Sequence, residues 1–107
     1  FGYPDNTFSQ PKNIFFGHVI ATLVGILFVT FLETSFITLA IAVGIAVMLM
    51  MAFNVTHPPA GGNPIIVMIG GVSFEYLFFP VIVGVITIIA MGIFYNRLIL
   101  KRKYPIT

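Results

Sequence analysis

The residues best suited to chemistry in this sequence are gathered in one short stretch, His57-Pro58-Pro59-Ala60-Gly61-Gly62-Asn63-Pro64. An α-helix cannot run through it, because prolines lack an N–H donor and disfavour the helical conformation of the preceding residue, while glycines accept backbone angles that other residues avoid. Within a membrane, such irregular backbone is tolerated only where protein buries it or where it lines a water-filled cavity. The stretch therefore predicts a functional site, whose structural break is made by Pro58, Pro59, Gly61, Gly62 and Pro64.

The composition of the chain is that of a membrane protein. Of its 107 residues, 59% are hydrophobic and only 7% are charged, with a mean hydropathy of +1.10, whereas about a quarter of the residues of a soluble domain are charged. The sequence contains no cysteine, which excludes a disulfide framework, a thiolate metal site and a sulfur nucleophile. We therefore expect an all-α transmembrane fold, a small helical bundle.

Three apolar runs are long enough to cross a bilayer, and we place these crossings at residues 14–32, 36–53 and 76–97 of a single domain, 1–107. The first run of 19 residues would extend about 29 Å as a helix, close to the hydrocarbon thickness. Asn13 and Asn63 are the expected N-caps of the helices that follow them. Residues 57–73 hold an apolar run too short to span, so they predict a re-entrant, broken-helix segment. Because the sequence opens with Phe1 and not Met, we expect a fourth crossing upstream.

Small residues recur at helical spacing and predict close helix packing. On the first run they are Gly17, Ala21 and Gly25, and on the second Ala40 and Gly44, with Ala42 and Ala46 alongside. Such rows let helix backbones approach one another in lipid.

A basic cluster follows the last apolar run and consists of Arg97, Lys101, Arg102 and Lys103. By the positive-inside rule this end is expected on the cytoplasmic side, or on the stromal or matrix side of an organelle. Four basic residues outside a basic fold do not predict a nucleic-acid site.

The short polar turn at residues 33–35 predicts that the first two helices run antiparallel, which places the start of the first beside the end of the second. The segments 10–13 and 57–64 should then share one face, and His18 lies about 7 Å along the helix from Asn13. This grouping gives the candidate substrate-binding residues, namely Gln10, Lys12, Asn13, His18, His57 and Asn63.

Two helix starts, near Asn13 and near Asn63, would direct free N–H groups and positive dipole ends into this region, and Lys12 adds a full charge. Broken helices whose N-termini face a substrate are a recurring feature of transporters. The pattern favours a small anion as ligand. A histidine in the site could instead carry a proton together with the anion, since its pKa lies near physiological pH.

Each of these residues also has a structural interpretation. His18 could serve simply to hydrogen-bond a neighbouring helix, and His57 could serve simply to cap the second helix. Lys12 could be an interfacial anchor. Enzyme chemistry is not indicated, because no carboxylate pair lies within an apolar run and no serine accompanies a histidine. His18, His57 and Glu75 lack the short spacing of a metal site, so neither a metal nor a cofactor is expected.

The elements Ser9-Gln10-Pro11-Lys12-Asn13, Gly17-His18 and His57-Pro58-Pro59-Ala60-Gly61-Gly62-Asn63-Pro64 resemble those of the HPP family of small integral membrane proteins. Lys12 stands where the family usually has arginine, and Gly62 ends a triplet that is commonly Ala-Gly-Ala. The resemblance implies a four-helix membrane domain, hence one helix upstream of Phe1, with both termini cytoplasmic and the His57 face external or lumenal. Family members in cyanobacteria and chloroplasts are linked to nitrite transport.

Together these observations predict membrane transport of a small inorganic anion, with nitrite favoured, through a site at the His-Pro-Pro break. The alternative is a structural or accessory subunit of a larger membrane complex. The expected partners are the lipid bilayer, a small anion, and further copies of the chain or other subunits.

Overall fold

The protein is an all-helical bundle in a computed structural model that describes residues 2–107. Its helices are α1 (Pro11–Phe31), α2 (Phe36–Ala52), α3 (Asn63–Gly70) and α4 (Val83–Phe94). Shorter helical turns flank them: η1 (Thr7–Ser9), η2 (Pro58–Gly62), η3 (Leu77–Ile82) and η4 (Tyr95–Ile99). No strand occurs in residues 2–107. The predicted all-α fold class is confirmed.

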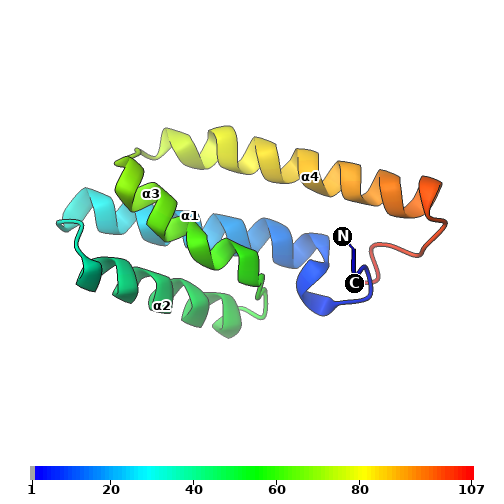
Figure 1. The fold of residues 1–107 in the computed structure, drawn as a ribbon, viewed down its shortest axis with the longest axis horizontal. Coiled ribbons are helices and arrows are strands. Elements are labelled where there is room, and N and C mark those ends of the chain that lie inside the picture. The colour runs from blue at the N-terminus through cyan, green and yellow to red at the C-terminus, as the bar shows by residue number, and fades with distance from the viewer. Residues whose placement is uncertain (1) are drawn as a thin grey trace.

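α1 lies at the centre of the bundle, with α2 along one side, α4 along the other, and α3 packed across it (Figure 1). One core cluster joins α1 to α2 and α3 through Ala21, Ala46 and Met68. A second cluster joins α1 to α3 and to η3 through Ile26, Val67 and Leu77. Every other helix is therefore held through α1.

Within residues 2–107, two helical stretches are long and apolar enough to cross a membrane: α1 with 21 residues, and the last helical rod, Leu77–Ile99, with 23 residues and a kink at Phe79. α2, with 17 residues, is shorter. Large apolar side chains point outward from α2 and from this rod, for example Phe36 and Met91, as expected where lipid is the solvent. The helices overlap the segments 14–32, 36–53 and 76–97, and the number of crossings stays a prediction.

The segment between α2 and the last rod differs from the expected re-entrant loop in its direction. It carries the chain along α1 from one end of the bundle to the other: Gly17 of α1 is beside His57, Gly25 is beside Pro64, and Thr34 approaches Met68 (Figure 1). A 3₁₀ turn rises about 2.0 Å per residue and an α-helix about 1.5 Å, so the five residues of η2 and eight of α3 cover roughly 22 Å. The greater rise per residue of η2 lengthens this segment, so that it reaches the far end of α1 instead of turning back.

The consequence is that four α-helices lie within residues 2–107. With α3 counted as one of them, this is the number of helices that the family resemblance implies for the domain. The two described ends of the chain lie together at one end of the bundle (Figure 1).

The predicted N-caps were wrong by one to three residues. The N-cap of α1 is Gln10 and that of α3 is Gly62. In α1 the proline at the first helical position, Pro11, sets the start, because its fixed φ angle suits that position and its missing N–H costs nothing there. Asn13 and Asn63 are therefore inside their helices.

The predicted close packing at Gly17, Ala21 and Gly25 is confirmed, since all three are buried. A Cβ atom on Gly17 would lie 2.7 Å from the Cβ of His57, and one on Gly25 would lie 2.9 Å from the Cα of Pro64. On α2 the buried row is Ala42 and Ala46, whereas Ala40 and Gly44 are exposed.

The ends of the short helices follow local chemistry. Ser35 caps α2 in a capping box with Thr38. Gly71 ends α3 with a φ of +62°, a left-handed conformation that glycine adopts without strain. Phe79 has extended backbone angles inside the last rod, because the residue before a proline, here Pro80, disfavours the helical region.

Candidate functional site

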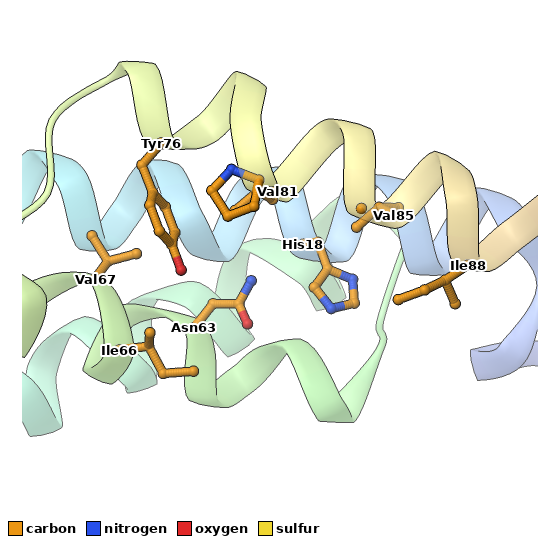
Figure 2. Close-up of a pocket in the computed structure, with 10 residues that line it drawn as sticks. His18, Asn63, Ile66, Val67, Tyr76, Val81, Val85 and Ile88 are labelled. Atoms are coloured by element: carbon orange, nitrogen blue, oxygen red, sulfur yellow. The ribbon is translucent and has the colours of Figure 1, made fainter.

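A cavity of about 210 Å³ lies between α1, α3 and the last helical rod (Figure 2). Its wall is apolar apart from His18 on α1, Asn63 on α3 and Tyr76 at the start of the rod. One buried water needs only about 15 Å³ of such space, so the cavity has room for a small hydrated ion. It is the place where polar side chains from three elements meet.

His18 faces the cavity from the middle of α1 (Figure 2). Its Nδ1 atom lies 2.8 Å from the carbonyl oxygen of Ile14. A carbonyl oxygen only accepts hydrogen bonds, so Nδ1 carries the proton and Nε2 of the neutral ring is an acceptor. The ring can offer a second donor only when it binds another proton.

Asn63 is held in place by α1. Its amide nitrogen donates to the hydroxyl of Thr22 at 3.0 Å, and Thr22 is fully buried. This bond holds the amide at the wall of the cavity. Figure 2 shows the hydroxyl of Tyr76 on the side of the ring that faces Asn63. Amide N–H and phenol O–H groups are both donors that an anion accepts.

His57 lies beside the cavity and does not line it. Its ring centroid is 5.1 Å from that of His18, and its Nδ1 atom donates to the carbonyl of Phe8 at 2.8 Å. Burial lowers the pKa of the His57 imidazole below its usual value, an effect that the bond to Phe8 opposes and the neighbouring His18 reinforces. His57 thus ties the Pro-Pro break to the loop before α1.

The remaining candidate residues lie outside the cavity, and two of them hydrogen-bond to the chain's own backbone. Gln10 is fully buried and its amide is used by the chain itself: Nε2 donates to Pro4 and Asn6, and Oε1 accepts from Ile106. The amide of Asn13 donates to the carbonyl of Thr56 at 2.8 Å, which clamps α1 to the break. Lys12 is exposed and lies outside the cavity lining.

The expected convergence of two helix starts is not found. α3 begins beside Thr22, which is 11 residues along α1 from Pro11, or about 16 Å from that helix start at 1.5 Å per residue. The N–H of Asn63 is bonded to Ala60, and Pro58, Pro59 and Pro64 have no N–H at all. The polar side chains that line this cavity are those of His18, Asn63 and Tyr76.

Of the predicted site residues, His18 and Asn63 line the cavity, whereas Thr22 and Tyr76 were not among the predicted residues. Thr22 reads as one polar residue in an apolar run, and only its contact with Asn63 gives it a role. Tyr76 could have been noticed as the polar residue that opens the last run. No three His, Cys, Asp or Glu side chains converge as metal ligands within residues 2–107.

A strongly apolar helical bundle with outward-facing hydrophobic side chains and a polar cavity beside a Pro-Pro break is an integral membrane domain. The chain belongs to the HPP family, since the family model described as HPP, transmembrane region, matches residues 1–105. This confirms the family that the motifs indicated.

Two proteins of Dictyostelium discoideum, both named as transmembrane proteins, are similar to the chain. One is 29% identical, covering 99% of this chain and 40% of the relative, and the other is 32% identical, covering 99% of this chain and 37% of the relative. The chain thus spans about two fifths of the length of these relatives. No solved structure matches the chain.

Proposed function

We propose that this membrane domain transports a small inorganic anion, with nitrite as the favoured substrate, and that the anion binds in the cavity between α1, α3 and the last helical rod. The observation that carries the proposal is the meeting of His18, Asn63 and Tyr76 in an otherwise apolar cavity at the Pro-Pro break. Polar and ionisable groups within a membrane domain are costly and mark substrate pathways. In this proposal the side chains of the cavity, and not two converging helix dipoles, hold the anion.

The hydrogen bond of His18 adds a constraint on the mechanism. Because Nδ1 is engaged by Ile14, Nε2 can donate to an anion only after the ring takes up a second proton. Anion and proton would then enter the cavity together, and the protonated ring would supply a charge-assisted bond. Proton-coupled uptake is therefore the form of transport that this geometry favours.

The test is nitrite uptake into proteoliposomes that contain the full-length protein, measured against protein-free liposomes to subtract passive leak. We expect uptake to rise as the external pH is lowered, and to fall by about tenfold or more in His18→Gln and Asn63→Ala, since each loses one strong hydrogen bond to the anion. In His18→Gln the remaining uptake should no longer depend on pH.

The matched control is Thr30→Val. Thr30 is also on α1 and also bonds the carbonyl four residues back, that of Ile26 at 2.6 Å, but it is not in the cavity. This variant should transport at the parent rate. If the folded parent protein moved no nitrite, nitrate or formate, transport would be abandoned in favour of a structural subunit.

A further inference from the structure

The charged side chains of the bundle are distributed unevenly between its two ends. All five basic residues lie at the end where the described chain ends meet: Lys12, Arg97, Lys101, Arg102 and Lys103. Two of the three carboxylates, Glu33 and Glu75, lie at the opposite end, in the turns before α2 and before the last rod. Asp5 is the carboxylate at the basic end.

Hydrogen bonds fix the basic residues of the tail beside Lys12. The hydroxyl of Tyr104 donates to the carbonyl of Ser9 at 2.7 Å, and the N–H of Ile106 donates to Gln10 at 2.8 Å. The N–H of Arg102 bonds the carbonyl of Asn96 at the end of the rod. All five basic side chains are exposed on this end, which we name the basic end.

The His-Pro-Pro break belongs to the basic end as well. His57 bonds Phe8 in the loop before α1, and Thr56 accepts from Asn13 in the first turn of α1. The break and the basic tail were expected on opposite sides of the membrane, because a re-entrant segment would have left an odd number of passages between them. Since η2 and α3 together carry the chain from the basic end to the opposite end, and the last helical rod returns it, the break and the tail share one end of the bundle.

We propose that the basic end lies against the anionic headgroups of the cytoplasmic, stromal or matrix leaflet, so that the His-Pro-Pro break is reached from that side. Lys and Arg next to a membrane helix are retained on that side, whereas carboxylates contribute little to orientation. The negative surface of that leaflet attracts juxtamembrane basic side chains. This inference does not depend on what the cavity binds.

Two single-cysteine variants test the orientation, since the chain has no cysteine of its own. Thr7→Cys places a thiol at the basic end and Ser73→Cys at the opposite end; both residues are exposed. In intact bacterial cells that express the protein, a membrane-impermeant maleimide should label Ser73→Cys at least about tenfold faster than Thr7→Cys, with equal labelling after permeabilisation. The reverse pattern, or equal labelling in intact cells, would overturn the proposal.

A charge variant separates the basic residues from other causes of orientation. Neutralising Lys101, Arg102 and Lys103 to Gln in the Ser73→Cys background should lower its labelling in intact cells by about half, as part of the protein inserts the other way. The matched control neutralises Glu33 and Glu75 to Gln and should leave labelling unchanged. Unchanged labelling in the triple Gln variant would show that the basic end does not determine the orientation of the protein in the membrane.

Contact with headgroups has its own readout. A donor fluorophore on Thr7→Cys in mixed vesicles should transfer energy to labelled phosphatidylglycerol about twofold more than to labelled phosphatidylcholine, and the triple Gln variant should abolish this preference. Equal transfer to both lipids in the parent would contradict the contact with anionic headgroups.

Discussion

Two glycines on α1 decide how closely the Pro-Pro segment can approach the centre of the bundle. Gly17 faces His57, and Gly25 faces the backbone of Pro64 at the start of α3. In lipid, where apolar side chains gain little by leaving the solvent, such close backbone contact is a main source of helix association. The position of Asn63 beside Thr22, and with it the cavity, depends on this contact.

We therefore expect Gly25→Ala to destabilise the domain. The added Cβ would lie 2.9 Å from Cα of Pro64 and 3.0 Å from Cβ of Val67, so α3 must shift, at a cost of about 1–3 kcal/mol. Thermal unfolding in detergent, followed by circular dichroism, should show a lower midpoint. Gly44→Ala on α2 is the control, because its Cβ meets nothing within 4 Å; an equal loss in both variants would contradict this account.

At the same scale, the sequence allowed His18 and Asn63 to be predicted as site residues but not the partners that orient them. An ionisable or amide group in an apolar run stands out by type alone. Thr22 does not, because its role comes from a contact with a residue 41 positions away that no local pattern encodes. Tyr76 is visible as the polar residue that opens the last run, but only the structure places it on the wall of the cavity. Gln10 was predicted as a site residue because its amide could bind a ligand, but in the structure that amide is hydrogen-bonded to backbone groups of the chain itself.

Among the elements, helix type and approximate position followed from the lengths of the apolar runs and from the turn residues between them, whereas the direction of α3 did not. A run of eight helical residues is too short to span, and the sequence does not show that η2 adds a steeper 3₁₀ rise before it. The same ambiguity misplaced the His57 face relative to the basic tail. Only the contacts of Gly17, Gly25 and Thr34 with this segment settle its course.

The carboxyl-terminal tail is a second element with a defined role, and Tyr104 anchors it. The Tyr104 side chain is fully buried and its hydroxyl donates to Ser9; burial raises the pKa of this phenol to about 12. Because the folded state holds the proton more tightly than the unfolded state, the group stabilises the fold below pH 10 and that contribution is lost as the pH rises toward 12.

Tyr104→Phe should accordingly lower stability at neutral pH by about 1 kcal/mol, through loss of one hydrogen bond. Between pH 10 and 12 the parent protein should lose stability faster than the variant, so that the gap between their unfolding midpoints closes. Unfolding in detergent at a series of pH values measures this gap. A gap that stayed constant up to pH 12 would show that Tyr104 does not anchor the tail as described.

For the molecule as a whole, the helices form a slab of 48 × 25 × 18 Å with α1 at its centre. The cavity lies toward one edge of this slab, and two of its apolar lining residues, Ile66 on α3 and Ile88 on α4, are 60% and 50% exposed. In a lone chain, this edge would leave the three polar side chains of the cavity close to hydrocarbon, where unsatisfied polar groups are costly. A second copy of the chain over this edge would separate the cavity from lipid.

Homo-oligomerisation across this edge is thus expected, and its location can be tested. Ile66→Trp should reduce the fraction of oligomers in vesicles, because a bulky ring disrupts a close-packed interface, whereas Ile41→Trp on the exposed side of α2 should not, since an aromatic ring is accommodated in lipid. Counting photobleaching steps of labelled protein at low protein-to-lipid ratio measures the copy number directly. Single steps for the parent would mean that the cavity edge faces lipid uncovered, and an equal effect of both substitutions would place the interface elsewhere.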